Sequence, residues 1–406
     1  MFKNKKPAVK TLLIAALFAL PAAYAQAQVK FLPVANASLL GGKYYLDSDA
    51  ASFQGRFDAF FSPTMQLGEG RDLIPVYAVN YSGTQDIQEL AGGDVLTRKR
   101  QTHTFSLKYV HTNDFNKYKP RFSYSKALIN ETKDEDWGDG LFDYATLSAG
   151  IDAEQERPHG TFVESYDFYK VSYPNYSSLL SQSQTVIDTT TFNELSANAG
   201  TDTMDNTNHR LGFSYSWFPE PMTMQAGYDF TYRRYGDQSV VGSLGSFKSD
   251  KRYDLAQNWS IRAARAAKPV YLSAKARVGW LSSNQNSYDS SRTKYIDDYY
   301  SYVDVSVSPA ATLALKNGTQ FSFGLDWRRL YYLNRLSQDV SGNYTSSKIR
   351  QTFWLTSISA RYPVFSSFFA RAAYNYQVSS SNMRYEDNYR YNYRASTYLM
   401  GLEWEF

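Results

Sequence analysis

The sequence lacks cysteine, long apolar runs and any concentration of histidine. None of its 406 residues is Cys, so disulfides do not hold the fold. Beyond the N-terminal region, no segment approaches the eighteen or so apolar residues of a transmembrane helix. No spacing of its four histidines suits a metal site, and no glycine-rich loop suits a phosphate. Disulfide scaffolds, helical membrane proteins and metal-dependent or nucleotide-dependent enzymes are therefore disfavoured, and no cofactor is expected.

The N-terminus has the pattern of a secretory signal peptide. A basic segment precedes an apolar core at Thr11–Leu20, and Ala23-Tyr24-Ala25 supplies a cleavage site made of small residues. Because Ala25-Gln26-Ala27 is an alternative site, we expect residues 1–25, or 1–27, to be removed. The formal charge of +4 then disappears, and nucleic-acid binding has no electrostatic support. The lysines that account for this charge are Lys3, Lys5, Lys6 and Lys10.

Aromatic residues are abundant although the chain is polar on average. They make up 17% of the sequence, with 35 Tyr, whereas the mean hydropathy is -0.49. A wall of strands with one face in lipid and the other in water combines these properties. Every second residue is then polar, and aromatic residues gather at the two membrane interfaces.

Apolar and polar residues alternate in segments of about ten residues, the period of a β-strand. The alternation is clearest in the second half, where Phe321, Phe323, Leu325 and Trp327 share one parity. In the first half, Pro75 places its strand near an edge or a bulge. There we expect strands at residues 36–46, 53–61, 73–81, 103–109, 120–125, 141–151 and 161–172.

The connections between these segments are alternately short and long. Asn317-Gly318 predicts a two-residue hairpin turn, and further tight turns are predicted at residues 219–221, 267–269 and 362–364. Long polar loops are predicted at residues 236–251, 282–297, 334–347, 379–388 and, longest of all, 173–206. Placing every tight turn at one end requires about sixteen strands, with fourteen as the alternative. The longest loop could fold into the lumen or stay on the surface.

The last strand ends on an aromatic residue, and one face of it carries Tyr398, Met400, Leu402, Trp404 and Phe406. This pattern resembles the closing strand of Gram-negative outer-membrane β-barrels, whose C-terminal aromatic residue serves as the assembly signal. The resemblance implies an all-β transmembrane antiparallel barrel at residues 36–406, after a short periplasmic segment at 26–35. Short periplasmic turns and long extracellular loops are expected. A secreted β-sandwich or solenoid, the rival architecture, would not alternate turns and loops so strictly.

In such a barrel, the parity opposite to the apolar one faces the lumen. Basic residues outnumber acidic ones there, and rings of Arg and Lys favour anions in a pore. Ion pairs between neighbouring strands would cancel this preference, and both interpretations are open. The predicted pore-lining residues are Lys108, Arg121, Arg210, Arg233, Arg262, Lys275, Arg277, Arg328, Arg371, Asp229, Asp254, Asp304, Asp326 and Glu403.

No catalytic constellation is evident. His103 and His209 lie on the lipid-facing parity, as in outer-membrane phospholipases, but no matched partner stands at a suitable spacing, so we interpret them as interfacial residues. Asp134, Glu135 and Asp136 share one loop, a feature similar to barrel proteases, but a charged loop is typical of solvated surface. We therefore predict no enzymatic activity.

The predicted function is passive diffusion of small hydrophilic solutes through a porin-like channel in the outer membrane of a Gram-negative bacterium. Fold alone does not decide function. One alternative is a conduit that works with periplasmic partners in polysaccharide, lipid or electron-carrier traffic, and another is a plugged structural or adhesin barrel. The resemblance implies contact with outer-membrane lipid and lipopolysaccharide. It also implies recognition of the C-terminal strand by the barrel assembly machinery, and a homo-oligomer is compatible with it.

Overall fold

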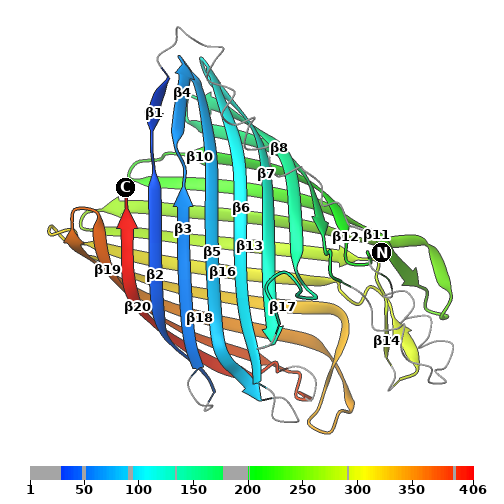
Figure 1. Cartoon of the computed structure of the whole chain (residues 1–406). Coiled ribbons are helices and arrows are strands. Elements are labelled where there is room, and N and C mark those ends of the chain that lie inside the picture. The colour runs from blue at the N-terminus through cyan, green and yellow to red at the C-terminus, as the bar shows by residue number, and fades with distance from the viewer. Residues whose placement is uncertain are drawn as a thin grey trace, which may run out of the picture.

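In the computed structural model, most of the described chain is strand (Figure 1). The described residues are 29–47, 52–89, 95–132, 135–176, 200, 202–289, 292–386 and 390–406. They contain no helix that is long and apolar enough to cross a membrane. The strands are β1 (Lys30–Leu32), β2 (Ala35–Leu46), β3 (Ser52–Phe61), β4 (Thr64–Gly68), β5 (Arg71–Glu89), β6 (Val95–Asn113), β7 (Asn116–Thr132), β8 (Tyr144–Arg157), β9 (Gly160–Ser172), β10 (Asn206–Trp217), β11 (Met222–Val241), β12 (Phe247–Ala267), β13 (Val270–Ser283), β14 (Ser287–Asp289), β15 (Lys294–Ile296), β16 (Tyr302–Ala314), β17 (Gln320–Gln338), β18 (Tyr344–Phe365), β19 (Phe368–Ser381) and β20 (Tyr393–Glu405).

Among these residues, eighteen strands form one antiparallel sheet, which closes into a barrel with sixteen strands around its wall. The difference arises because two wall strands are broken. β1 and β4 continue β2 and β3 beyond Pro33 and Pro63, and they pair with each other. Proline cannot donate to the ladder, which explains the breaks. The predicted fold class and the count of sixteen strands are confirmed.

The same interruption accounts for Pro75 in β5. That strand pairs with β4 through residues 71–73 and with β3 from Tyr77 onward, so Pro75 lies opposite the gap between β3 and β4. Its missing N–H therefore costs no ladder hydrogen bond on that side. The sequence placed Pro75 near an edge or a bulge; the structure places it opposite a gap in the neighbouring strand, with no register shift at that position. The strand predicted at 161–172 is β9, and the one predicted at 141–151 lies slightly further along the chain, as β8.

The barrel closes where the last strand meets the first. β20 pairs with β19 on one side and with β2 on the other, in a register that places Asn36 opposite Glu405. One residue further, the backbone N–H groups of Ala35 and Phe406 each donate to the carbonyl oxygen of the other at 2.8 Å. Hydrocarbon offers backbone groups no water, so pairing along this seam removes an edge that lipid could not solvate.

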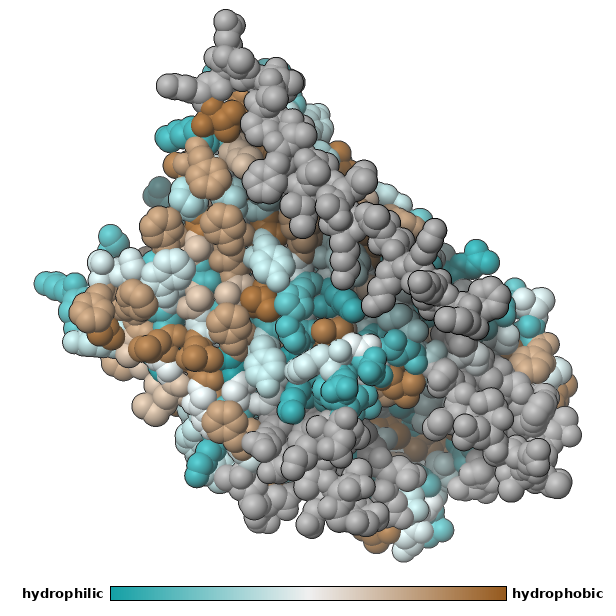
Figure 2. Space-filling model, viewed as in Figure 1, coloured by the Kyte–Doolittle hydropathy of each residue, from teal (hydrophilic) through white to brown (hydrophobic). Residues whose placement is uncertain are grey.

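The two faces of the wall differ in character. In β20, Met400 and Leu402 are 71% and 59% exposed, whereas Leu399 and Glu403 on the other face are 5% and 8% exposed. Apolar side chains gather over the part of the wall where Figure 1 places β2, β3 and β20 (Figure 2). The convex face is therefore apolar and suited to lipid. Exposed apolar residues on alternate positions of β17 and β18 include Phe321, Phe323, Trp354, Ile358 and Tyr362.

The turn at Asn317-Gly318 is wider than predicted. The Gly318 N–H donates to the Leu315 carbonyl at 3.0 Å, and the Leu315 N–H donates to the Thr319 carbonyl at 2.8 Å. A two-residue type I′ turn needs positive φ at both central residues. Here only Gly318 has it, at 85°. The prediction of a two-residue turn is wrong because one left-handed glycine suffices for the wider turn.

The turn predicted at residues 362–364 is also displaced. β18 continues through Pro363, and the chain turns at Ser366-Ser367. Pro363 lies past the last pair between β17 and β18, which joins Gln320 to Arg361. Its missing N–H therefore costs no hydrogen bond with β17, and the strand tolerates it.

Two predicted loops are projecting hairpins instead. Within residues 236–251, β11 continues to Val241 and β12 starts at Phe247. Within residues 334–347, β17 continues to Gln338 and β18 starts at Tyr344. Beyond the apolar band both faces of a hairpin meet water, so the alternation that reveals a strand disappears. The long loop at 282–297 likewise contains the hairpin β14–β15.

Some predictions fall outside the described residues. These are the signal peptide, at residues 1–25 or 1–27, and most of the loop at 173–206, of which the structure describes residues 173–176, 200 and 202–206. Within the segment 26–35, residues 30–32 form β1 and join the sheet.

A charge on the outer face of β17 should destabilise the barrel more than a charge on its inner face. Phe323 points outward and is 48% exposed, whereas its neighbour Ser322 points inward. We expect Phe323→Arg to lower the free energy of unfolding in lipid vesicles by about 2–4 kcal/mol, because arginine at mid-depth is costly in hydrocarbon. Ser322→Arg, the matched control, should cost less. Equal losses in urea titrations would contradict the assignment of the two faces.

Candidate functional site

The charged residues predicted to line the lumen share the inner face of the wall. Residues that pair directly across a ladder point to the same face. Lys108 pairs with Arg121, which pairs with Gly150. Gly150 in turn pairs with Asp167, which pairs with Arg210. Register assigns the same inner face to the other predicted residues: Asp229, Arg233, Asp254, Arg262, Lys275, Arg277, Asp304, Asp326, Arg328, Arg371 and Glu403.

Asp304 in β16 lies between two arginines. Its Oδ1 atom is 3.1 Å from Nη2 of Arg277 in β13, and its Oδ2 atom is 3.0 Å from Nε of Arg328 in β17. The Asp304 side chain is 1% exposed, whereas those of Arg277 and Arg328 are 37% and 44% exposed. The carboxylate is therefore hidden, and the arginine side chains are what the lumen meets.

A glycine makes room for this carboxylate. Gly279 pairs directly with Asp304 and lies two residues after Arg277, on the same face. A Cβ at Gly279 would be closer than van der Waals contact to Asp304 Oδ1 and 2.9 Å from Arg277 Nη2. The arginine side chain thus reaches the aspartate across the space that the missing side chain leaves.

The same arrangement recurs in β10 and β11. Gly212 pairs with Asp229 and lies two residues after Arg210, whose Nη2 atom is 2.5 Å from Asp229 Oδ1. The sequence signal in both cases is Arg-x-Gly, at residues 210–212 and 277–279. That signal becomes specific only when register places an aspartate opposite the glycine, so sequence reasoning missed it.

Two more carboxylates contact two arginines each. Asp254 is 3.2 Å from Arg252 and 3.9 Å from Arg233, and Glu403 is 3.2 Å from Arg371 and 3.4 Å from Arg361. The side chains of Asp254 and Glu403 are 4% and 10% exposed. On this part of the wall, acidic groups are covered by basic ones.

On β7, β8 and β9, acidic residues are at least as frequent in the ion pairs as basic ones. Arg121 forms ion pairs with both Asp152 and Asp167, the second at 2.6 Å. Nearer the tight-turn end, Lys117 and Lys119 both pair with Glu154, and Lys117 also pairs with Glu156. The inner wall therefore carries an arginine-rich part and a part where acidic and basic groups balance.

Not every inner charge is paired. Within the part of the chain that the structure describes, no ion pair involves Lys108, Arg262, Lys275 or Asp326. Arg262 and Lys275 pair with each other in the register of β12 and β13. Two adjacent cations without carboxylate partners give this patch a positive potential.

Small residues hollow the inner wall beside these charges. A recess of about 240 Å³ lies over β9–β12, where Gly212, Gly227, Ser214 and Ser260 leave space next to Arg210. A larger recess of about 670 Å³ lies closer to the tight turns and includes Arg262. Side chains therefore do not fill this side of the barrel.

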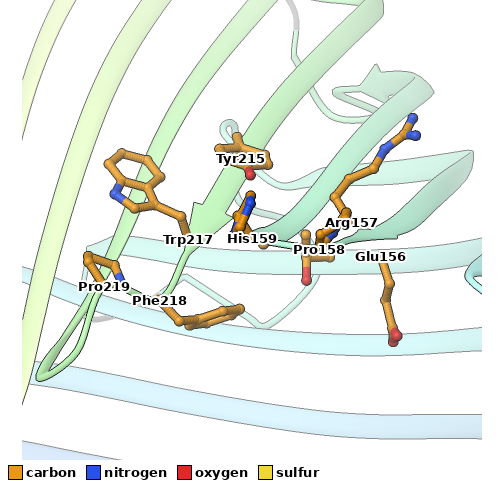
Figure 3. Close-up of a pocket in the computed structure, with 10 residues that line it drawn as sticks. Glu156, Arg157, Pro158, His159, Tyr215, Trp217, Phe218 and Pro219 are labelled. Carbon is orange, nitrogen blue, oxygen red and sulfur yellow. The ribbon is translucent and has the colours of Figure 1, made fainter.

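A third cavity, of about 910 Å³, lies at the rim between the β8–β9 and β10–β11 turns. Figure 3 shows Tyr215 and Trp217 from β10 beside His159 of the neighbouring turn. The two β10 rings are stacked at 5.9 Å. Aromatic residues with polar tips are typical of the membrane interface, so we interpret this cavity as part of the interfacial rim.

The outward histidines pair with tyrosines. The Tyr77 hydroxyl is 2.8 Å from His103 Nδ1, and the Tyr166 hydroxyl is 2.8 Å from His209 Nδ1. His103 also lies 2.6 Å from the side-chain nitrogen of Gln101. These contacts satisfy polar atoms on the outer face.

The acidic loop has a structural role where it is described. The Glu135 carboxylate accepts a hydrogen bond at 2.6 Å from the backbone N–H of Glu131, and its carbonyl accepts one from Asn130. Asp134 lies outside the described residues. In the described part of the chain, no three or more metal-ligating side chains lie together.

At the long-loop end, an aspartate holds the β14–β15 hairpin to β18. Arg292 contacts Asp289 at 2.5 Å, and its Cζ atom lies 4.0 Å from the centre of the Tyr344 ring. Burial and a hydrogen bond to Asp289 raise the pKa of Tyr344 to about 12. Burial favours a higher pKa for Asp289, but its bonds with Tyr344 and Arg292 outweigh this and lower the pKa.

The Gly279 arrangement can be tested with two glycines on the inner face. A Cβ at Gly324 would meet only Ser357 Cβ, at 3.9 Å. We expect Gly279→Ala to lower the free energy of unfolding by about 1–3 kcal/mol, because overpacking displaces the Asp304 carboxylate. Gly324→Ala should be close to neutral. Urea unfolding in vesicles measures both, and similar losses for the two variants would contradict a special role for Gly279.

The hairpin contact should weaken in acid. Because the pKa of Asp289 is lowered in the folded state, its stabilising effect is complete above the unfolded value of 3.8 and is lost as pH falls through the folded pKa. Tyr344→Phe removes one bond that lowers this pKa, so the loss should begin at a higher pH. Amide hydrogen exchange of residues 284–301 measures it; an unchanged pH profile in the variant would refute the coupling.

Comparisons with known proteins find a likeness in fold alone. No protein-family model matches the chain, and no curated protein is significantly similar in sequence. OmpT of Vibrio cholerae, an outer-membrane protein solved in a trimer form, is 10% identical over 93% of this chain and 99% of its own, with a TM-score of 0.46. The anion-selective porin of Comamonas acidovorans is 10% identical over 93% and 100%, with a TM-score of 0.45. OccD3 of Pseudomonas aeruginosa is 6% identical over 94% of both chains, with a TM-score of 0.48.

Proposed function

We propose that this chain is a porin-like, water-filled channel in the outer membrane of a Gram-negative bacterium, open to small hydrophilic solutes. The observation that carries the proposal is the exposure of charged groups on a concave face. The side chains of Arg277 and Arg328 are more than one-third exposed although they point into the barrel. Charged groups in a dry core would be strongly destabilising, so water must reach them.

The apolar outer face supports the membrane location. Large apolar side chains occupy alternate outward positions, and Phe406 at the end of the closing strand is 67% exposed. Exposed apolar area of this extent needs a partner, and lipid is the partner that surrounds a closed barrel on every side. We propose that the outward face of β20 is also what the assembly machinery recognises.

A weak anion preference is the finer part of the proposal. Ion pairs could have cancelled the charge of the lumen. Instead, the carboxylates of Asp254, Asp304 and Glu403 are covered by arginines that stay in contact with water. Arg262 and Lys275 add positive charge that no described carboxylate neutralises. A solute in the lumen would therefore meet more positive than negative groups, which favours anions.

The anion preference can be tested at Arg262 and Lys275. Because no described ion pair involves them, Arg262→Gln with Lys275→Gln should leave the fold intact and remove two positive charges from the lumen. In planar bilayers under a salt gradient, we expect the reversal potential of the double variant to move toward cation permeability. The matched control, Lys268→Gln with Lys316→Gln, changes two exposed lysines in the tight turns and should leave the reversal potential unchanged.

The channel itself has a separate test. Proteoliposomes should swell in isotonic solutions of small sugars and stop swelling as sugar size increases. Liposomes that stay impermeable to all sugars would refute the open channel and favour a plugged barrel. A cation-selective unmodified barrel that passes sugars would refute the anion preference alone.

A further inference from the structure

Basic side chains lie on the outer face toward the long-loop end of the apolar band. On each strand concerned, a lysine or an arginine shares the parity of the outward apolar residues and lies on their long-loop side. In β17, for example, Phe323, Leu325 and Trp327 are followed on the same face by Arg329. We call these residues the cationic belt: Lys43, Lys170, Arg234, Arg329, Arg350 and Arg394.

The belt is densest on β17 to β20, at the orange and red end of the chain (Figure 1). Arg329 pairs with Thr352, and Thr352 pairs with Ser380. Arg350 lies two residues from Thr352 on the same face, and is therefore a diagonal neighbour of both Arg329 and Ser380. Arg394 pairs with Val378 and is likewise a diagonal neighbour of Ser380. Diagonal neighbours on one face are about 7–8 Å apart, so the three arginines lie next to Thr352 and Ser380 on the outer face.

A smaller group with the same chemistry lies across the barrel. Lys170 in β9 pairs with Thr207 in β10, which pairs with Arg234 in β11. Two cations thus flank one hydroxyl, on adjacent strands and on the outer face. The combination of cations next to a hydroxyl residue therefore occurs at two places on the outer face.

The arginines of the denser group have no acidic partners in the described structure. Arg350 and Arg394 are exposed, and no described ion pair involves Arg329, Arg350 or Arg394. The nearby carboxylate of Asp47 is occupied, because it accepts a bond from the backbone N–H of Arg394 and pairs with Arg390 at 3.0 Å. These groups are thus available to an anion from outside the chain.

Aromatic rings lie directly below the denser group. Trp327 and Trp354 pair two residues below Arg329 and Thr352, with ring centres 6.3 Å apart. Tyr374 and Tyr398 pair further along the wall, with centres 4.7 Å apart. Such rings lie at the level of lipid headgroups. The arginines just above them are therefore at the depth of headgroup phosphates.

The other end of the barrel is different. Toward the tight turns, outward charges have both signs, as with Glu164 in β9 and Arg265 in β12. An excess of cations at only one boundary suits a membrane whose two leaflets differ in headgroup charge.

We infer that Arg329, Arg350 and Arg394, with the hydroxyls of Thr352 and Ser380, bind phosphate groups of lipids in the leaflet at the long-loop end. Arginine binds phosphate oxygens through two parallel N–H donors, and the hydroxyls can donate to the remaining oxygens. The lipid chains would lie on the apolar band immediately below. The inference rests on the membrane placement proposed above, but not on conduction through the lumen.

The test compares two triple variants of the full barrel in non-ionic detergent. Arg329→Gln, Arg350→Gln and Arg394→Gln together remove the denser group. Arg265→Gln, Lys268→Gln and Lys316→Gln together remove the same charge at the tight-turn end. Native mass spectrometry measures the apparent affinity for dioleoyl phosphatidic acid, with dioleoyl phosphatidylcholine and inorganic phosphate as further probes. Sugar permeability of the same preparations in liposomes is measured separately.

We expect the unmodified barrel to prefer phosphatidic acid over phosphatidylcholine, and the first triple variant to lose at least about tenfold in apparent affinity for phosphatidic acid. The second triple variant should bind as the unmodified barrel does. Equal losses in both variants, or no preference between the two lipids, would overturn the inference. Inorganic phosphate bound as tightly as phosphatidic acid would indicate a free-ion site and overturn the lipid assignment. Impermeable liposomes with unchanged lipid binding would refute only the channel.

Discussion

The structure depends on one constraint: every backbone N–H and C=O group that faces lipid depth must find its partner within the wall. The seam between β2 and β20 meets this constraint, ending in the reciprocal bonds between Ala35 and Phe406. Breaks in the ladder lie where they cost least. Pro75 lies opposite the gap between β3 and β4, and Pro363 lies beyond the end of the β17 ladder. The closed ladder fixes which side chains face lipid and which face the lumen.

Closure then creates an interior that must be either packed or hydrated. The inner wall carries small polar residues and charged ones, and recesses next to Arg210 and Arg262 show that side chains do not fill it there. Ion pairs do form, but they are asymmetric, because the carboxylates are buried and the arginines remain in contact with water. Glycines such as Gly279 make this geometry possible by leaving space for a carboxylate between two strands. The charge that a solute would meet is therefore set by which partner of each pair is covered.

The outer face is organised by depth. Apolar residues form the band, tryptophans and tyrosines lie near its limits, and basic residues follow on the long-loop side. The hairpins that project beyond this boundary continue as strands, and the β14–β15 hairpin is held to them by Asp289, Arg292 and Tyr344. In the proposed membrane placement, each layer matches the solvent at its own height, which changes from hydrocarbon to headgroup to water.

The barrel class and the two parities could be predicted from the sequence, because hydrophobic alternation is a local property that each strand carries alone. The sequence left sixteen or fourteen strands open, and the structure has sixteen. It also placed the predicted charged residues on the inner face. Alternation could not detect the projecting hairpins, where both faces meet water, nor place the turn beyond Pro363. Which charges pair and which stay exposed depends on the tertiary structure. The arginine of each Arg-x-Gly sequence reaches an aspartate because the strand register places Asp304 or Asp229 opposite the glycine. The same holds for the grouping of Arg329, Arg350 and Arg394, which are distant in sequence and become neighbours only because antiparallel pairing aligns β17 to β20.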